Sequence, residues 1–246
     1  MAMMTRKMRV VCLHGWRTNA RILRHQTAGL RAALGDDAEF LFLDGTFKAS
    51  GPAQEVVQTF YQHEAPFFEW WDAVKLPTAD ASANERYAYR YEGVDETLRS
   101  VSERIRALQP VDALVGFSQG AGLTTLLTAH WLRQHEAVPW KACVLVSGFR
   151  PRAKEVKHLL EDANGHRVKI SVPSIHIIGE ADAIVRQCHD LYDTYADESA
   201  GVRRLKFLHD EGHKFPTPGK YRDLYKQVAS ELARMVLPLD AEKAGL

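Results

Sequence analysis

The sequence predicts an α/β fold built on one mostly parallel sheet of about six strands, with helices on both faces. Short apolar runs alternate with longer segments of helical periodicity along most of the 246 residues. Most of these strands are apolar along their whole length, as expected where helices cover both faces of a parallel sheet. Right-handed crossovers would make the sheet doubly wound and residues 1–246 a single domain.

The expected strands are short runs rich in β-branched and aliphatic residues. In chain order they are residues 8–13, 39–43, 111–117, 141–147, 174–178 and 203–208. The first, MRVVCL, ends at His14-Gly15. The fifth, SIHII, begins directly after the strand breaker Pro173.

The expected helices carry apolar residues at a spacing of three and four. They are residues 19–34, 94–108, 119–134, 184–195 and 221–236. Gly35 ends the first helix and Pro110 closes the second, as these residue types usually do. The third, which follows the sequence GFS, is apolar on most of its surface and is expected to be deeply buried.

The segment 47–93 breaks this alternation. We can assign no clear strand in it, but aromatic residues gather there: Phe60, Tyr61, Phe67, Phe68, Trp70, Trp71, Tyr87, Tyr89 and Tyr91. A connection this long is usually functional or disordered, and its aromatic content argues against disorder. We expect a lid or pocket wall, with Phe67, Trp70 and Trp71 as candidate pocket residues; the alternative is an insertion packed on the sheet edge.

Composition excludes several classes of function. The chain has 32 lysines and arginines against 31 aspartates and glutamates, a net charge of +1. This balance offers no electrostatic reason to expect nucleic acid or an anionic membrane as partner. Three cysteines without CxxC spacing indicate a reducing compartment, and no apolar stretch is long enough for a membrane span. We expect a cytoplasmic protein.

One glycine-flanked serine is a candidate nucleophile. The stretch LVGFSQGAG places Ser118 between Gly116 and Gly120, after the third strand and before an apolar helix. In Gly-x-Ser-x-Gly the serine occupies a sharp strand-to-helix turn with its hydroxyl projecting. Such a pentapeptide arises by chance in roughly one chain in twelve of this length, so the motif needs support from other residues.

A serine nucleophile needs a base, and the base needs a carboxylate. In one fold the three follow in the order Ser, Asp, His at the ends of parallel strands. The fifth strand runs into a polar loop containing Asp182, which lies nearest the loop apex before the next helix. We take Asp182 as the acid, with Glu180 and Asp190 as rivals. A role as helix N-cap is the alternative for Asp182.

The sixth strand runs into the loop HDEGHKFP. We take His213 in this loop as the base, because it follows the strand and Gly212. His209 is the rival, but it lies at the strand end with less freedom to swing toward Ser118. His14, in a different loop, is expected to hydrogen-bond that loop rather than act as base.

The tetrahedral intermediate would need two N–H donors for its oxyanion. One is the backbone N–H of Gln119, immediately after the nucleophile. The other should come from the loop after the first strand, and the N–H of Trp16 is the candidate. Because the donors are backbone groups, the side chains of Trp16 and Gln119 are not dictated by this task.

Other chemistries find no support in the sequence. No GxGxxG follows the first strand, and GxxxxGK[ST], HExxH and paired Cys/His spacings are absent. Dinucleotide, nucleoside phosphate and metal sites are therefore not expected. Hydrolysis by a serine nucleophile needs no cofactor.

Five sequence blocks, in order along roughly residues 8–237, resemble one family. They are LHGW at 13–16, GFSQGA at 116–121, LVSGF at 145–149, GEADAIV at 179–185 and HDEGHKFP at 209–216. The chain resembles the fungal family of serine hydrolases, which includes the ovarian cancer-associated hydrolases of animals. The resemblance implies an α/β-hydrolase fold and a triad of Ser118, Asp182 and His213. It also implies that Ser147, Gly148 and Phe149 line the acyl pocket.

Members of the resembled family hydrolyse carboxylic esters or thioesters. Some act on long-chain alkyl esters, and others release polyketides from synthases. We therefore expect a serine esterase or thioesterase for a small-molecule substrate, and the aromatic segment favours medium- to long-chain acyl groups. Acyl transfer in a biosynthetic pathway uses the same residues and stays open. A hydrolase-fold binding protein without turnover is a third possibility, and the sequence does not specify the oligomeric state.

Overall fold

The computed structural model has a six-stranded sheet in which every neighbouring pair is parallel. It describes residues 6–76, 89–134 and 137–236. The strand order is β10-β9-β8-β7-β1-β2. The bounds are β1 Met8–Leu13, β2 Ala38–Leu43, β7 Ala113–Phe117, β8 Ala142–Val146, β9 Ser174–Gly179 and β10 Arg204–His209. The predicted fold class, with its six strands, is confirmed.

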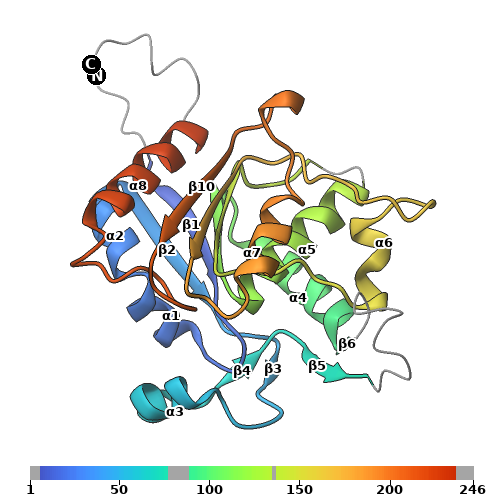
Figure 1. The fold of residues 1–246 in the computed structure, drawn as a ribbon, viewed down its shortest axis with the longest axis horizontal. Coiled ribbons are helices and arrows are strands. Elements are labelled where there is room, and N and C mark those ends of the chain that lie inside the picture. Colours follow the sequence, from blue (N-terminus) through green and yellow to red (C-terminus); the bar gives the residue numbers. More distant parts are fainter. Residues whose placement is uncertain (1–5, 77–88, 135–136, 237–246) are drawn as a thin grey trace.

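Helices cover both faces of this sheet (Figure 1). On one face lie α1 (Ala20–Gln26), α2 (Ala28–Leu34) and α8 (Arg222–Val236). On the other lie α4 (Val94–Ala107), α5 (Gln119–Arg133), α6 (Lys157–Leu160) and α7 (Val185–Tyr192). Each face therefore has its own apolar core.

Alternate side chains of the central strands enter the two cores. Val11 and Leu13 of β1 pack in the core that contains α4 and α5 residues. Val10 and Cys12 pack in the core with Leu23 and residues of α8. This alternation follows from the two-residue repeat of a strand. It explains why the central strands are apolar throughout.

Two predicted helices differ from those observed. The expected helix 19–34 is two helices, α1 and α2, that meet at Thr27. The Thr27 hydroxyl donates to the carbonyls of Leu23 and Arg24, at 2.9 and 3.2 Å, where it competes with regular backbone pairing. The expected helix 184–195 is shorter at both ends, spanning Val185–Tyr192.

The structure contains short strands in 47–93, where the sequence shows no clear strand. This segment contains β3 (Phe47–Lys48), α3 (Glu55–Tyr61), β4 (Phe68–Glu69), β5 (Asp72–Lys75) and β6 (Tyr89–Glu92). β3 pairs with β4, and β5 with β6, both antiparallel. Strands of two to four residues are too short to show an alternating pattern. Tyr87 lies outside the described residues.

This additional segment lies at one end of the sheet, at the bottom of Figure 1. Loops that follow β1, β7, β9 and β10 reach the same end, because parallel strands share the direction of their carboxyl ends. In the part of the chain that the structure describes, no helix has the length and apolar character to cross a membrane.

Candidate active site

Ser118 occupies a strained turn between β7 and α5. Its φ of 52° and ψ of −114° place it in a region that side-chain-bearing residues rarely adopt. A Cβ on Gly116 would overlap the Gly120 carbonyl, and a Cβ on Gly120 would overlap the Leu13 carbonyl. Both glycines are therefore required by the close approach of strand and helix. Strain of this kind is typical of functional sites.

Three predicted site residues from separate loops form one hydrogen-bonded chain. Ser118 Oγ lies 2.9 Å from His213 Nε2, and His213 Nδ1 lies 2.8 Å from Asp182 Oδ2. The Asp182 side chain is fully buried, whereas that of His213 keeps 26% of its surface exposed. A buried carboxylate favours the tautomer in which Nδ1 carries the proton, which leaves Nε2 as acceptor for the serine hydroxyl.

Asp182 has a second contact that holds it in place. Its Oδ1 accepts the backbone N–H of Ile184 at 2.9 Å, so the residue also caps the turn that leads into α7. The capping role and the contact with His213 thus use different oxygens of one carboxylate. The rivals lie elsewhere: Glu180 is exposed, and Asp190 pairs with Arg167.

The rival His209 is buried and does not point into the hydrogen-bonded chain. Its ring packs edge-on against Tyr221 at 5.7 Å, and neither ring nitrogen has a partner among the described residues. Burial lowers the pKa of His209. The nearby Gly179 is tightly packed, since a Cβ there would overlap the Glu211 carbonyl.

His14 has a structural role, as predicted. It is fully buried, and burial lowers its pKa to about 4. Its Nε2 accepts the Gly45 N–H at 2.8 Å, so Nδ1 carries the proton and donates to Gly15 O at 2.7 Å. These bonds, with the Trp70 indole N–H on the His14 carbonyl at 2.8 Å, hold the loop after β1.

That loop and the start of α5 carry the two predicted oxyanion donors. Gln119 is the first residue of α5, where a backbone N–H has no intrahelical acceptor. Trp16 borders the space around Ser118, and Arg17, which follows it, has a φ of 51°. Among the described residues, the non-glycine positions with positive φ are Arg17, Ser118 and Ser147. Backbone strain is thus concentrated at the carboxyl ends of β1, β7 and β8.

The side chain of Gln119 has a role that sequence reasoning missed. Its Oε1 accepts the Trp70 N–H at 3.2 Å, and its Nε2 donates to the Trp71 carbonyl at 2.8 Å. The Thr97 hydroxyl donates to the Trp70 carbonyl. The two bonds of Gln119 attach the additional segment to α5, the helix that follows Ser118. The residue pair Gln119 and Trp70 is 49 positions apart, so no local pattern could reveal it.

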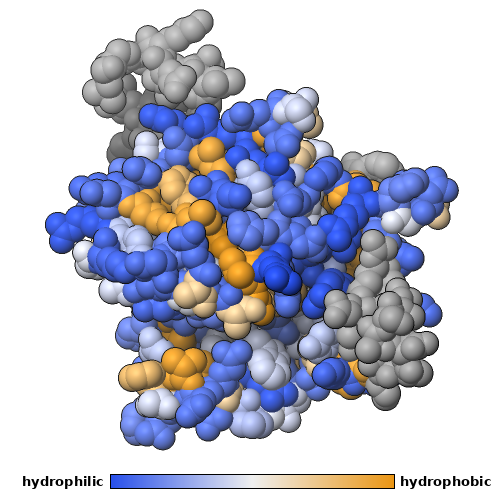
Figure 2. All heavy atoms as spheres, in the orientation of Figure 1, coloured by the Kyte–Doolittle hydropathy of each residue, from blue (hydrophilic) through white to orange (hydrophobic). Residues whose placement is uncertain are grey.

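Two cavities meet at Ser118. The first, which we name the α3 cavity, has a volume of about 590 Å³ and lies between α3 and the loop after His213. Val56 and Phe60 of α3 line it and are largely exposed, and an apolar patch covers α3 at the lower left of Figure 2. Trp16 and Gln54 line both cavities and so stand at their boundary.

The second, which we name the aromatic cavity, has a volume of about 580 Å³. It contacts Ser118, Asp182 and His213, and its remaining lining is mainly aromatic and aliphatic. Members of that lining are Trp16, Trp71, Ala73, Tyr89, Tyr91, Phe149, Ala183 and Ile184. Burial raises the pKa of Tyr91 to about 12, so its hydroxyl stays protonated.

Only some of the predicted pocket residues line these cavities. Trp71 and Phe149 line the aromatic cavity. The other two candidates, Trp70 and Phe67, line neither cavity: Trp70 is fully buried in the core, and Phe67 packs on the small cluster around Ile22. Ser147, implied as lining by resemblance, is buried without contact to either cavity.

Gly148, the other residue implied by resemblance, also lies outside the lining. A Cβ at this position would press on Leu191 and Ala121, so the glycine allows α5 and α7 to approach each other. Phe149 is therefore the one residue of the Ser147–Gly148–Phe149 block that reaches the aromatic cavity.

The parallel sheet, the strained serine turn and the ordered loops define an α/β hydrolase. Two solved structures share this fold. Acyl-protein thioesterase 2 of Zea mays matches with a TM-score of 0.61 at 17% identity, covering 93% of this chain and 95% of the maize chain. Esterase PE8 matches with a TM-score of 0.59 at 18% identity, covering 94% of each chain. The similarity covers nearly the whole chain, and the predicted α/β-hydrolase fold is confirmed.

The family is shown by sequence. Residues 4–225 match the serine hydrolase family FSH1, and the chain belongs to that family. It is therefore an enzyme of the serine hydrolase class. It is 28% identical to Esterase OVCA2 of Homo sapiens, over 93% of this chain and 98% of the human protein. The corresponding protein of Danio rerio is 26% identical, over 89% and 95%.

Proposed function

We propose that this protein hydrolyses carboxylic esters or thioesters, with Ser118 as nucleophile, His213 as base and Asp182 as the acid that orients the imidazole. The observation that carries the proposal is the hydrogen-bonded chain from Ser118 Oγ through His213 to Asp182, with distances of 2.9 and 2.8 Å. Membership of the serine hydrolase family and the similarity to proteins named esterase support it.

In the first half of the reaction, Ser118 Oγ attacks the carbonyl carbon of the ester while His213 Nε2 takes the hydroxyl proton. The carbonyl oxygen becomes an oxyanion, and the N–H groups of Trp16 and Gln119 are the proposed donors to it. The intermediate collapses when His213 returns the proton to the leaving oxygen or sulfur. The alcohol or thiol departs, and an ester between the acyl group and Ser118 remains.

In the second half, water attacks this acyl-enzyme. His213 takes a proton from the water, and Asp182 stabilises the imidazolium that forms. The second tetrahedral intermediate collapses when His213 returns the proton to Ser118 Oγ. The carboxylic acid is released and the enzyme is regenerated. Every proton transfer passes through His213 Nε2, and none requires a cofactor.

The aromatic cavity supports a preference for medium- to long-chain acyl groups. Trp71, Phe149 and Ile184 offer apolar surface next to Ser118, and each methylene that they remove from water contributes about 0.8 kcal/mol. The kcat/KM values for p-nitrophenyl esters should therefore rise from acetate toward decanoate. Equal rates along this series would contradict the preference.

The nucleophile is tested with Ser118→Ala. This variant should lose p-nitrophenyl ester turnover and labelling by a fluorophosphonate, because both need the serine oxygen. Ser147→Ala is the matched control, since Ser147 also has a positive φ but its hydroxyl is buried away from both cavities. Labelling that persists in Ser118→Ala would contradict the assignment.

Acyl transfer would use the same residues with an alcohol, amine or thiol in place of water. The α3 cavity offers a second space for such an acceptor, because it borders Ser118 and His213 and has a lining largely different from that of the aromatic cavity. The ratio of transfer product to free acid, measured with added acceptors, separates the two reactions. Three buried free cysteines support a reducing, cytoplasmic location.

A further inference from the structure

The aromatic cavity contains one cation that the proposed mechanism does not use. Arg152 lies in its lining together with Tyr89 and Tyr91. Among the described residues of this lining, Arg152 is the only lysine or arginine. An arginine in a mainly apolar lining needs an explanation, because a guanidinium is costly to place beside apolar surface without a partner.

Arg152 forms no ion pair with a carboxylate among the described residues. The contrast is Arg150, two positions earlier, which is buried and lies 3.5 Å from the carboxylate of Glu161. The nearby Glu155 accepts the backbone N–H of Tyr91 at 3.4 Å. The charge of Arg152 therefore remains available to a ligand in the cavity.

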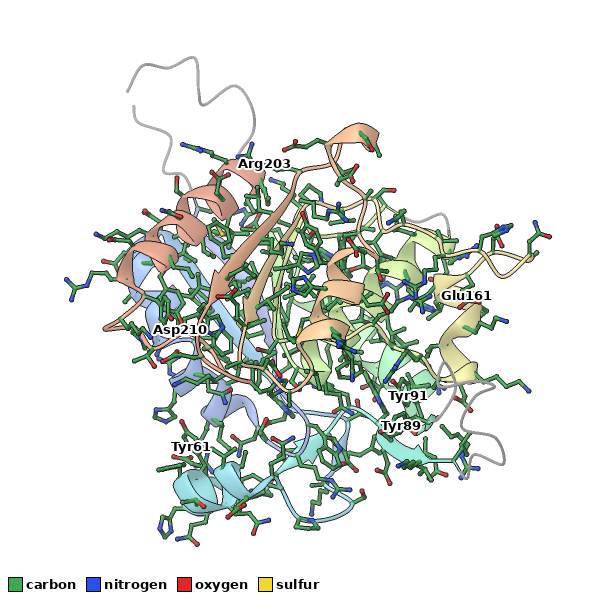
Figure 3. The ribbon with its side chains drawn as sticks, viewed as in Figure 1. Tyr61, Tyr89, Tyr91, Glu161, Arg203 and Asp210 are labelled. Carbon is green, nitrogen blue, oxygen red and sulfur yellow. The ribbon has the colours of Figure 1, made fainter. Side chains whose placement is uncertain are left out.

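The surroundings of Arg152 fix its position relative to the cavity. Its backbone N–H donates to the Tyr91 hydroxyl at 3.5 Å. Tyr89 and Tyr91 are two residues apart on β6, which places both side chains on one face, and Figure 3 shows them next to each other. The lining therefore combines phenol hydroxyls with a guanidinium, and both are donors suited to a carboxylate.

A carboxylate in the same cavity would not be repelled by the site. The carboxylate residue in the described lining is Asp182, which has the same charge as the ligand. Its carboxylate is fully buried, and its two oxygens are taken by His213 and by the Ile184 N–H. Ser118 and Arg152 thus line the same cavity, with the proposed nucleophile at one place and, at another, a cation that has no carboxylate partner within the described part of the chain.

We propose that the aromatic cavity takes an acyl chain that ends in a carboxylate, which pairs with Arg152. This inference rests on the proposed function and names its substrate class: monoesters or monothioesters of dicarboxylic acids. Attack by Ser118 on the ester carbon breaks the bond to the alcohol or thiol, and water then releases the dicarboxylic acid. The reaction that supplies such a substrate must leave one carboxyl of a dicarboxylic acid esterified and the other free.

The test compares two esters that differ in one charge. The acidic substrates are mono-p-nitrophenyl esters of dicarboxylic acids from adipic to sebacic acid. The neutral partners are the same compounds with the free carboxyl capped as a methyl ester. For at least one chain length, kcat/KM of the acidic ester should exceed that of its neutral partner by about tenfold to a hundredfold, the value of a charge-assisted hydrogen bond.

In Arg152→Gln the ratio of the two kcat/KM values should fall to about one, and in Arg152→Lys part of the preference should remain. Because both esters are measured on the same protein, a general loss of folding changes their ratio little. Arg186→Gln, an exposed arginine on α7 outside the cavity lining, removes the same charge and should keep the wild-type ratio.

The outcomes separate this inference from the proposed function. Hydrolysis of neutral esters with a wild-type ratio near one, or a ratio that Arg152→Gln leaves unchanged, overturns the carboxylate preference while the esterase function stands. An equal fall of the ratio in Arg186→Gln also overturns it, because the effect would then be general electrostatics. If neither ester is hydrolysed, the proposed function fails and this inference fails with it.

Discussion

The guanidinium of Arg17 lies 3.0 Å from the carboxylate of Glu69, and this ion pair joins the loop after β1 to β4. The side chains are 13% and 2% exposed, so the pair is nearly buried. Glu69 Oε1 also accepts the Ser50 N–H at 2.9 Å, and the Arg17 guanidinium donates to the Ser50 hydroxyl at 2.7 Å. The loop after β1, which carries the proposed oxyanion donor Trp16, is therefore held in place by the additional segment.

Glu69→Gln should weaken both the fold and the proposed catalysis. Removing one partner of a buried pair leaves a charge poorly compensated, although Asp72 lies 3.7 Å from Arg17 and offsets part of the loss. We expect a fall of about 2 kcal/mol in the free energy of unfolding, measured with urea. We also expect kcat to fall more than KM rises, because Trp16 is next to Arg17. Glu39→Gln removes an exposed pair with Arg9 and should cost less than about 1 kcal/mol; equal losses would contradict this reasoning.

Gly120→Ala should prevent the serine turn from forming. Its new Cβ would overlap the backbone carbonyl of Leu13, which cannot move without displacing β1. Overpacking of this kind costs about 1–3 kcal/mol or more, so we expect lower thermal stability and loss of fluorophosphonate labelling. Gly122→Ala is the control on the same helix, because its Cβ would make ordinary contacts of 3.5 Å with Phe149. A Gly120→Ala protein that is as stable as Gly122→Ala would show that the turn is less tightly packed.

Asp182→Asn should abolish most activity while the loop is kept. The asparagine Oδ1 can still accept the Ile184 N–H, but its amide would donate to His213 Nδ1. The imidazole then carries its proton on Nε2 and cannot accept the Ser118 hydroxyl. The same change in a serine protease triad lowers kcat by about 10⁴, and we expect a loss of that order. Asp190→Asn on α7, which breaks the contact with Arg167, is the control and should keep esterase activity.

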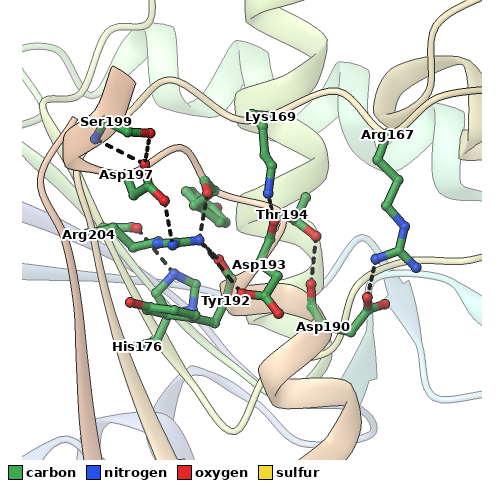
Figure 4. A network of polar contacts seen from close by, with 12 residues as sticks. Arg167, Lys169, His176, Asp190, Tyr192, Asp193, Thr194, Asp197, Ser199 and Arg204 are labelled. Atoms are coloured by element: carbon green, nitrogen blue, oxygen red, sulfur yellow. Dashed lines mark hydrogen bonds and ion pairs between the residues drawn. The ribbon is translucent and has the colours of Figure 1, made fainter. Parts of the chain in front are cut away.

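Acid should destabilise the protein partly through His176. Burial, together with the charges of Arg204 and Lys206, lowers the pKa of His176 to about 3 from an ordinary value of 6.5. Its ring packs edge-on against Tyr192 and Tyr195, in the polar network of Figure 4. Below the ordinary value the unfolded chain binds a proton that the folded chain does not. The free energy of unfolding therefore falls as pH falls, by about 1.4 kcal/mol per pH unit for this group.

His176→Phe keeps the ring packing and removes the titrating group. Urea unfolding as a function of pH, between about pH 6 and about pH 4.5, should show a slope shallower than the wild type by about 1.4 kcal/mol per pH unit. His158→Gln replaces an exposed histidine and should leave the slope unchanged. An unaltered slope in His176→Phe would mean that this histidine does not contribute to acid destabilisation. His14, with a pKa of about 4, accounts for part of the slope that remains.

Much of the fold could be predicted because its signals are local. The apolar strands, the helical periodicity and the glycines around Ser118 are properties of short segments. The order Ser118, Asp182, His213 at strand ends was readable for the same reason, since a parallel sheet brings its carboxyl ends to one edge. The paired strands of 47–93 were missed because pairs of two to four residues show no period.

Trp70 and Trp71 mark the limit of local reasoning. Both are aromatic, adjacent and fully buried, yet Trp70 packs on His14 while Trp71 lines the aromatic cavity. Neighbouring side chains of an extended segment point to opposite sides, and the sequence does not say which side faces the cavity. Contacts between distant residues decide this, among them the bonds from the Gln119 side chain to both tryptophan backbones.

The sequence by itself determined the class of fold, the serine turn and the loops that carry the proposed nucleophile, acid and base. These follow from hydrophobic period, from glycine at positions without room for a Cβ, and from the direction of parallel strands. Only the tertiary structure decided the sheet order, the Arg17–Glu69 pair, the residues that line each of the two cavities, and the absence of a carboxylate partner for Arg152 among the described residues. Each of these depends on groups far apart in the chain, whose distances are set by packing and are not encoded in any local pattern.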